Sequence, residues 1–491
     1  MEAQIRRVGV ALVIAFLAIF LQLNYVQIFA AEDIAGNNAN IRSLLAEYSI
    51  KRGDILTVDF KPIATSQSTN DRFEFLRTYP EGELYGQITG YYSLVSGTRG
   101  IESAYNDQLL GESGVISMQD VEDTFLGSGE RGDDVRLTID SRLQELAREQ
   151  LGDQEGSVVV LDPGNGEVRA MYSNPTYDPG PLASHDSDEI RNYYRSLNPT
   201  SPSSPLLSKA LRTSFPPGST FKVVSAGAAL ESGQFTPSST FPDPDAIDLP
   251  LTDDTLTNFT NTSCTGTGQI DLFTALEISC DTTFALIGLR IHDELGNTAQ
   301  QFGFNDTIPF DLTTEASTFP DVPDDQEPLR AFAGIGQGDV SATPIQMALV
   351  AAAIANDGVV PRPRLVRDIR DPSGSIVEEP APESIGRALS SATAADLSRM
   401  MTAVVQSDSG TGTAARIEGV EVAGKTGTAQ TVEGAAPHAW FIAFAPVSNP
   451  QVAVAVLVEN GGTLGSEATG GQIAAPIAKA LIERDREIRQ W

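Results

Sequence analysis

The chain is 491 residues long and 41% hydrophobic, so it is too long for one typical domain and too apolar to be disordered throughout. Its 65 acidic residues outnumber its 33 basic residues, which gives a formal net charge of −32 at pH 7. This balance excludes a nucleic acid partner, because phosphate recognition requires a basic surface.

The first predicted element is a membrane-spanning helix near the N-terminus. Arg6 and Arg7 precede an apolar run from Val8 to Leu23, and about 20 such residues can cross a bilayer. The arginines favour a cytoplasmic N-terminus, which leaves the rest of the chain outside the cell membrane. A cleaved signal peptide is the alternative, since Phe29-Ala30-Ala31 offers small residues for cleavage. We expect an uncleaved single-pass anchor over residues 1–31.

Residues 32–134 are predicted to form a small α+β module outside the membrane. The segment contains an aromatic-rich stretch from Tyr79 to Tyr92, but it has no cysteine or histidine. It is also too short to hold a glycosyltransferase domain beside a catalytic one. We therefore expect a pedestal or a partner-docking module rather than a second enzyme.

The remaining residues, 135–491, are predicted to form one mixed α/β domain. Helical periodicity over Asp140–Leu151 is followed by a β-hairpin over Gly156–Tyr172. The stretch Pro179–Pro205 is rich in Pro, Ser and Asn and is expected to be a loop. Residues 236–262 are expected to be an insertion dominated by loops.

Further along the chain, apolar spacing predicts several helices before strands return. The predicted helices are Ser219–Glu231, Leu272–Ile278, Phe284–Ile291, Pro344–Asn356, Ala394–Val405 and Gly471–Arg484. We expect Thr393 to cap the helix that starts at Ala394. A strand over Ile417–Ala423 is expected to lead into Lys425, and strands over Ala439–Ala445 and Val452–Val458 complete an antiparallel set. Strands at both ends of the domain with helices between them indicate a layered α/β fold.

Ser219 and Lys222 are the first residues whose spacing indicates chemistry. Positions three apart share one face of a helix, and the helix N-terminus favours negative charge and offers free N–H groups to an oxyanion. Lys222 would act as a base if burial and a second cation, Lys425, lowered its pKa. The alternative is structural: Ser219 would cap the helix, and Lys222 would be an ordinary solvated residue.

Lys425-Thr426-Gly427-Thr428 forms a second motif in a strand context. Side chains alternate along a strand, so Lys425 and Gly427 face one way while the two threonines face the other. A glycine within a strand allows a ligand or another backbone to approach closely. The alternative is an ordinary edge strand.

The histidines give no sign of metal chemistry. His185, His292 and His438 do not cluster with cysteines or carboxylates at a metal-ligating spacing. We expect no metal site and no cofactor.

Ser279-Cys280-Asp281 lies between these two motifs, and the combined pattern resembles the class B penicillin-binding proteins, most closely the actinobacterial penicillin-binding protein A group. The resemblance runs from Arg52 to about Lys479. Besides the three motifs, it is carried by the segments Arg52-Gly53-Asp54-Ile55, Gly100-Ile101-Glu102, Val160-Leu161-Asp162-Pro163, Pro175-Thr176-Tyr177-Asp178-Pro179, Gly336-Gln337-Gly338, Thr343-Pro344-Ile345-Gln346-Met347-Ala348 and His438-Ala439-Trp440-Phe441.

This resemblance implies a fold and an activity. The fold is a transpeptidase domain like that of penicillin-binding proteins and serine β-lactamases: an antiparallel sheet with helices on both faces, plus an α-helical subdomain. The activity is that of a membrane-anchored D,D-transpeptidase that cross-links peptidoglycan and is acylated by β-lactams. The implied partners are peptidoglycan stem peptides on a lipid-linked precursor, β-lactams as covalent inhibitors, and a membrane glycosyltransferase.

The resemblance also implies how the acyl-enzyme forms. Ser219 attacks the penultimate D-Ala carbonyl of a stem peptide, and Lys222 takes its proton. Ser279 relays a proton towards the leaving D-Ala. An amino group from a second stem peptide then resolves the ester.

The strand motif is implied to bind the substrate. Lys425 supplies positive charge, and Thr426, Gly427 and Thr428 form the binding strand, with the two threonines on the terminal carboxylate. The backbone N–H groups of Ser219 and Thr428 are implied to form the oxyanion hole.

Asp281 departs from the family, which usually has Asn there. An amide donates and accepts hydrogen bonds, whereas an ionised carboxylate only accepts. Asp281 could pair with Lys222 or Lys425 and hold the lysine charged, which would oppose the base role. It could also accept hydrogen bonds from Lys222 and the substrate amide with little loss. We expect activity to be retained.

Cys264 and Cys280 are the only cysteines, and the environment of an exported protein can oxidise them. A disulfide would brace the middle motif, and the resembling group also has a cysteine at the position of Cys280. Two buried free thiols are the alternative.

Two other functions stay open at this stage. A D,D-carboxypeptidase or β-lactamase uses related motifs, although no Glu-x-x-Leu-Asn segment for deacylation is present. A catalytically weak scaffold or β-lactam sensor of the cell-wall machinery is the third possibility, and Asp281 is the one feature that hints at it.

Overall fold

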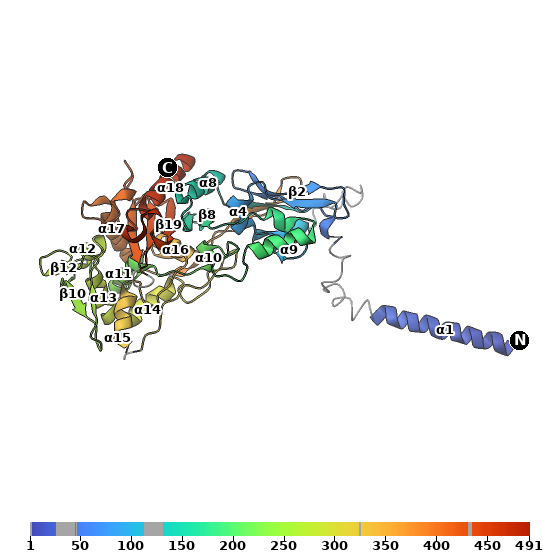
Figure 1. Cartoon of the computed structure of the whole chain (residues 1–491), viewed down its shortest axis with the longest axis horizontal. Helices are drawn as coiled ribbons and strands as arrows, with labels where there is room; N and C mark the ends of the chain where they lie inside the picture. Colours follow the sequence, from blue (N-terminus) through green and yellow to red (C-terminus); the bar gives the residue numbers. More distant parts are fainter. Residues whose placement is uncertain (1, 26–44, 46, 112–130, 324–325, 431–434) are drawn as a thin grey trace.

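The computed structural model describes residues 2–25, 45, 47–111, 131–323, 326–430 and 435–491 (Figure 1). Helix α1 (Glu2–Asn24) forms from the apolar N-terminal run. Its segment Arg6–Asn24 is the one helix in the described chain that is long and apolar enough to cross a membrane. The side chains described along it are exposed, as expected of a helix that needs a lipid environment.

The first module is built on a six-stranded sheet of order β15-β14-β6-β1-β2-β3. Its strands are β1 (Ile55–Leu56), β2 (Pro62–Ser68), β3 (Phe75–Thr78), β6 (Asp134–Leu137), β14 (Val366–Arg370) and β15 (Ile376–Glu378). The helices α4 (Gly82–Thr89), α5 (Ile101–Ala104) and α6 (Asn106–Leu110) and the short strands β4 (Tyr92–Ser93) and β5 (Gly97–Thr98) complete it. Two strands of this sheet thus come from far downstream in the chain.

A buried ion cluster holds the module together. The Glu102 carboxylate accepts from Arg52 Nε and Arg77 Nε, each at 2.6 Å, and from the Tyr79 hydroxyl at 3.2 Å. Because the carboxylate is fully buried, its pairing with two guanidinium groups keeps its pKa below the ordinary value despite burial. Arg52 and Glu102, which belong to segments that carry the family resemblance, therefore have a structural role in this cluster and do not line the cleft.

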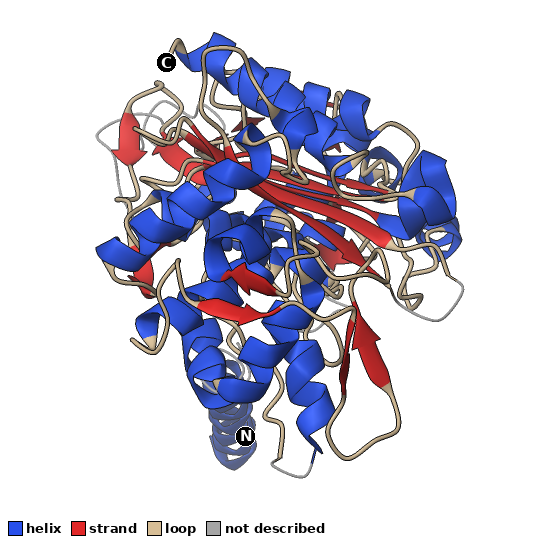
Figure 2. Cartoon of the chain, turned by 90° about the vertical axis from the view of Figure 1, so that its left-hand side faces the viewer, coloured by secondary structure: helices blue, strands red, loops and turns tan. Residues whose placement is uncertain are grey.

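A five-stranded antiparallel sheet of order β17-β18-β19-β7-β8 forms the centre of the catalytic domain. The strands are β7 (Gly156–Leu161), β8 (Val168–Asn174), β17 (Ala423–Ala429), β18 (His438–Ala445) and β19 (Val452–Val458). Helices α8 (Ser141–Leu151) and α18 (Ala474–Arg489) pack together on one face, and α10 (Lys209–Arg212), α16 (Pro344–Ala355) and α17 (Ser391–Gln406) pack on the other. Figure 2 shows that helices cover both faces of the sheet. With helices on both faces, β18 and β19 read as continuous apolar runs.

A mainly helical subdomain lies beside this sheet. It contains α11 (Lys222–Glu231), α12 (Leu272–Glu277), α13 (Asp281–Arg290), α14 (His292–Gln301) and α15 (Glu327–Gly334). Two small antiparallel pairs accompany them: β9 (Thr240–Pro242) with β12 (Gln269–Asp271), and β10 (Ala246–Asp248) with β11 (Thr255–Thr257). A further pair joins β13 (Val359–Pro361) to β16 (Ser384–Arg387). The predicted fold class is confirmed.

Three local predictions are wrong, each for a physical reason. The expected loop Pro179–Pro205 contains helix α9 (Ser187–Ser196), which the Asp186 carboxylate caps by accepting from two backbone N–H groups. Helix α17 starts at Ser391, so Ser390 is its cap and Thr393 supplies the N–H that Ser390 accepts.

The third wrong prediction is the strand expected over Ile417–Ala423. Ile417 and Val420 form only an isolated bridge around Gly419, whose φ of 73° turns the chain. The strand itself begins at Ala423.

Candidate active site

Ser219 lies in a short 3-10 turn, Gly218–Thr220, immediately before α11. The sequence predicts that Ser219 opens the α-helix itself, whereas the regular helix begins three residues later. Gly218 has a φ of 52°, and its N–H donates to the Gly336 carbonyl at 2.9 Å. A Cβ at Gly218 would lie 3.1 Å from the Thr428 carbonyl oxygen. The turn is therefore pressed against β17, and glycine is what allows the approach.

Lys222 is fully buried below this turn, and its ammonium group is directed at the middle motif. Nζ donates to Asp281 Oδ1 at 2.6 Å, to the Ser279 carbonyl at 2.8 Å and to Ser279 Oγ at 3.3 Å. Within the described residues no hydrogen bond joins Lys222 to Ser219. Lys222 contacts Ser279, which lines the same cleft as Ser219.

Ser279 joins the two lysines of the cleft. Lys425 Nζ donates to Ser279 Oγ at 2.8 Å and to the Thr426 carbonyl at 3.0 Å. Ser279 has a φ of 64°, a conformation that costs a non-glycine residue energy and that tends to persist at functional sites. One hydroxyl therefore lies between two buried ammonium groups.

Burial lowers the pKa of Lys222, while the charge of Asp281 and its hydrogen bond oppose that shift. Burial lowers the pKa of Lys425 well below its usual value, and the nearby charge of Lys222 lowers it further, against a smaller opposing effect of Asp281. The ion pair with Asp281 thus favours the protonated form of Lys222, whereas the charge of Lys222 opposes protonation of Lys425.

A cleft of ≈ 460 Å³ opens above these groups. Ser219, Ser279, Asp281, Thr426 and Thr428 all line it, which brings the three sequence motifs to one place. The alternation along β17 places both threonines on the cleft, as the strand pattern predicts.

Gly427 does not line the cleft but faces the nucleophile turn. A Cβ there would lie 2.9 Å from both the Pro217 carbonyl oxygen and Thr220 Cγ2.

A disulfide joins Cys264 to Cys280, so the loop before β12 is tied to the residue between Ser279 and Asp281. Asn258 Oδ1 also accepts from the Thr282 N–H at 3.0 Å. The Asp243 carboxylate lies near both sulfurs, but the sulfurs are bonded to each other and Asp243 accepts the N–H groups of Cys264 and Thr265. This arrangement is a structural brace rather than a metal centre.

Sequence reasoning missed several residues that line the cleft. They are Asn258, Phe259, Thr260, Ile278, Thr411, Thr469 and Gly471. Thr411 Oγ1 lies 2.6 Å from Thr426 Oγ1, and the Phe259 side chain is 74% exposed at the cleft. These residues sit in loops and carry no motif, so only the tertiary arrangement reveals them.

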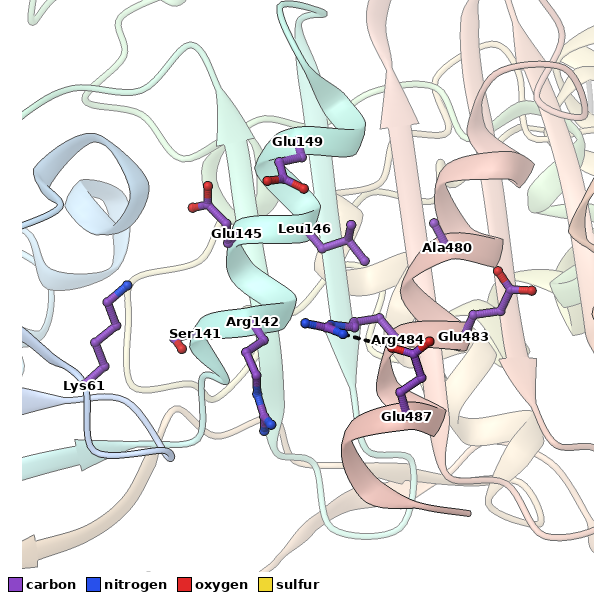
Figure 3. Close-up of a pocket in the computed structure, with 10 residues that line it drawn as sticks. All are labelled: Lys61, Ser141, Arg142, Glu145, Leu146, Glu149, Ala480, Glu483, Arg484 and Glu487. Atoms are coloured by element: carbon purple, nitrogen blue, oxygen red, sulfur yellow. Dashed lines mark hydrogen bonds and ion pairs between the residues drawn. The ribbon is translucent and has the colours of Figure 1, made fainter.

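A second hollow, of ≈ 550 Å³, lies between α8 and α18 (Figure 3). Arg142, Glu145, Glu149, Glu483, Arg484 and Glu487 contribute most of its side chains. The one hydroxyl that lines it, on Ser141, donates to Asp59 at 2.6 Å. Charged surface side chains of both signs without a nucleophile do not make a catalytic centre.

Comparison with known proteins agrees with this geometry. The sequence profile of the penicillin binding protein transpeptidase domain matches residues 156–483, and that of the penicillin binding protein A dimerisation domain matches residues 52–135. The peptidoglycan D,D-transpeptidase PbpA of Mycolicibacterium smegmatis is 39% identical and that of Mycobacterium tuberculosis is 36% identical; each alignment covers 98% of this chain, and 98% and 99% of the relative. The solved ceftriaxone acyl-enzyme complex of penicillin-binding protein A from M. tuberculosis superposes with a TM-score of 0.84 at 37% identity, covering 89% of this chain and 99% of that chain.

Proposed function

The chain belongs to the penicillin-binding protein transpeptidase family, and we propose that it is a peptidoglycan D,D-transpeptidase that β-lactams acylate. The observation that carries this proposal is the Ser279 hydroxyl held between Lys222 and Lys425 in the cleft that Ser219 lines. Buried lysines beside a serine supply a base without histidine. The mycobacterial relatives carry the same activity in their names.

The proposed reaction starts when Ser219 Oγ attacks the penultimate D-Ala carbonyl of a stem peptide. The hydroxyl proton passes to the lysine pair, and the backbone N–H groups of Ser219 and Thr428 stabilise the oxyanion. The C–N bond then breaks, Ser279 passes a proton to the departing D-Ala amine, and an ester to Ser219 remains. An amine of a second stem peptide attacks this ester, forms the cross-link and restores the hydroxyl.

Lys222 is proposed as the general base, and Asp281 sets the conditions under which it acts. The ion pair of 2.6 Å between Lys222 Nζ and Asp281 Oδ1 favours the protonated form of Lys222. Lys222 can therefore act as a base only after its proton has passed to another group. Ser279 Oγ contacts both Nζ atoms and provides a path for a proton to Lys425, whose pKa is lowered by burial and by the charge of Lys222. Proton sharing through Ser279 reconciles retained activity with the carboxylate of Asp281.

Thr426 and Thr428 are proposed to bind the terminal carboxylate of the stem peptide or of a β-lactam. Both line the cleft from one side of β17, and a charge from Lys425 would support them when it is protonated. Gly427 serves the same strand by letting it lie against the nucleophile turn.

The decisive experiment is intact mass spectrometry of the full chain after incubation with penicillin G. We expect the wild-type protein to gain the mass of one penicillin and Ser219→Ala to gain none. A penicillin adduct on the Ser219→Ala protein would refute the assignment of the nucleophile. Slow loss of the adduct from the wild type would separate a transpeptidase from a β-lactamase.

The protein is also proposed to be anchored with its N-terminus in the cytoplasm and its catalytic domain outside. The support is the helix Arg6–Asn24, with arginines at its N-terminal end. Treatment of intact cells with a protease that cannot cross the membrane would digest the catalytic domain if this topology is right. A protected domain would contradict it.

Residues 32–134 are proposed to form a pedestal that docks a membrane glycosyltransferase, since that enzyme must deliver glycan strands to a cross-linking site. The support is that the described part of this region surrounds the buried Glu102 cluster and contributes no residue to the cleft. Cross-linking of the full chain in membranes, followed by identification of the partner, tests the proposal. A partner attached only to the catalytic domain would contradict it.

A further inference from the structure

A polar hollow of ≈ 520 Å³ lies at the junction between the first module and the catalytic domain. Arg99 and Ser103 line it from the module, and Ser208, Arg212 and Asp311 line it from the catalytic domain. It shares no lining residue with the cleft of Ser219. Any ligand of this junction pocket is therefore separate from the reacting substrate.

Two arginines of the junction pocket lack a carboxylate partner. The guanidinium group of Arg212, half-buried at the end of α10, makes no hydrogen bond or ion pair with any part of the chain that the structure describes, and its Nε is fully buried. Arg99 lies beside the Tyr91 phenol and pairs with no described carboxylate. Most other arginines of this acidic chain do pair with Asp or Glu, as Arg364 does with Glu167 at 2.7 Å and Arg131 does with Asp134 at 2.8 Å.

A buried hydroxyl in the same pocket is also unsatisfied. Ser208 is only 6% exposed, and its Oγ has no hydrogen-bond partner among the described residues. Buried hydroxyl groups are normally bonded, because an unpaired one loses its hydration without compensation. The unused donors of the pocket are thus the guanidinium of Arg212 and the hydroxyl of Ser208, and Arg99, which bonds to the Tyr91 side chain, adds a guanidinium without a described carboxylate partner.

The single acidic residue that lines the pocket is already engaged. Asp311 Oδ1 accepts from the Tyr105 hydroxyl at 2.6 Å, and Oδ2 accepts from the Leu365 N–H at 2.5 Å. These bonds hold Asp311 to the first module and to the segment before β14 rather than to the arginines. The positive charge of the pocket stays uncompensated within a chain of net charge −32.

We propose that the junction pocket binds an oxyanion group, either a carboxylate or a phosphate. Arg212 and Arg99 supply the charge and planar N–H donors that suit such a group, and the Ser208 hydroxyl adds a neutral donor. A wall peptide would provide the carboxylate, whereas a lipid-linked precursor or free phosphate would provide the phosphate. The proposal does not depend on the transpeptidase reaction.

Titration calorimetry of the full chain in a non-ionic detergent tests the proposal, with inorganic phosphate and the tripeptide L-Ala-γ-D-Glu-L-Lys as separate probes. We expect saturable binding of at least one probe, and the probe that binds identifies the source of the anion. Arg212→Gln should weaken that binding by at least about tenfold, since it removes the charge and keeps most of the length of the side chain. Ser208→Ala should weaken it by a smaller factor.

Arg99→Gln provides the second arm, because Arg99 is exposed and its replacement leaves the fold intact. The matched control is Arg195→Gln, which removes an exposed arginine of α9 that lies outside the pocket and has no described ion pair. The control should bind like the wild type. Absence of binding by both probes, or wild-type affinity in both Arg99→Gln and Arg212→Gln, would overturn the proposal.

Discussion

Asp281 and Ser279 determine how the two buried lysines of the cleft share their protons. The carboxylate pairs with Lys222, the hydroxyl touches both Nζ atoms, and burial and the charge of Lys222 lower the pKa of Lys425. An asparagine at this position would donate and accept hydrogen bonds without a charge. The carboxylate of Asp281 therefore favours the protonated form of Lys222 more than an amide would.

Asp281→Asn should accelerate acylation at neutral pH. Burial lowers the pKa of Lys222 and Asp281 opposes that shift, so removal of the carboxylate lowers the pKa further and enlarges the neutral fraction. Each pKa unit of this further lowering corresponds to about a tenfold larger neutral fraction while the lysine is mostly protonated. The measurement is the pH profile of the acylation rate with a fluorescent penicillin.

The alkaline rise of this profile should move to lower pH in Asp281→Asn. Asp408→Asn serves as the control, because that carboxylate is fully exposed at the surface and does not line the cleft. An unchanged midpoint would show that Asp281 does not govern the proton of the base.

At the scale of elements, the site depends on how closely β17 lies against the turn Gly218–Thr220. Glycines on both sides, Gly218 and Gly427, make this contact possible. The strand supplies Thr426 and Thr428, and the turn supplies Ser219, so their spacing fixes the distance between nucleophile and carboxylate site.

Gly427→Ala should destabilise the domain by about 1–3 kcal/mol and slow acylation, because the new methyl group overlaps the Pro217 carbonyl and Thr220. Gly386→Ala is the matched control, since a Cβ there meets no atom within 4 Å. Chemical unfolding gives the stability, and labelling with fluorescent penicillin gives the rate. Equal effects of the two substitutions would refute the role of the close approach.

The disulfide between Cys264 and Cys280 is the second feature that supports the site at the scale of elements. Cys264→Ala together with Cys280→Ala should cost on the order of 3 kcal/mol, because the bond closes a loop with a sequence separation of 16. Acylation should also slow, since Cys280 adjoins the strained Ser279. Thermal unfolding with and without reductant provides the measurement, and an unchanged midpoint in the double variant would remove the structural role.

The sequence predicts the elements with strong periodicity and misses those that depend on polar contacts. The central strands and helix α16 follow from continuous apolar runs, and helix α8 follows from apolar residues at helical spacing. The sequence pattern does not predict helix α9, because most of its residues are polar and its start depends on the N-cap hydrogen bonds of Asp186. The motifs predict which residues gather in the cleft, but the bond between Lys222 and Asp281 depends on side-chain geometry that no spacing reveals.

At the scale of the whole molecule, the first module and the catalytic domain share a sheet. β6 pairs in parallel with β1 and antiparallel with β14, and β14 pairs with β15. The predicted division at residue 134 stays a prediction, and the structure places β6 (Asp134–Leu137) across that position. Backbone hydrogen bonds rather than a flexible linker connect the two regions at this point.

A fragment that starts at residue 135 should therefore be less stable than one that starts at residue 45. It loses β1, one of the two strands that pair with β6, and it uncovers Val135 and Leu137, which are fully buried in the full chain. We expect a thermal midpoint at least about 5 °C lower, together with aggregation. Differential scanning calorimetry of the two fragments checks this, and equal midpoints would show that the catalytic domain is independent.

The shared sheet fixes the position of the catalytic cleft relative to the first module. Because β14 belongs to the catalytic part of the chain and pairs with β6 in the sheet of the first module, the cleft has a fixed distance from that module and a fixed orientation relative to it. A partner that docks on the first module, as proposed above, would thereby determine where in the wall the cross-link is placed. Substitutions that weaken the pairing of β6 with β14 would leave the acyl-transfer chemistry intact but make the position of the cross-links less precise.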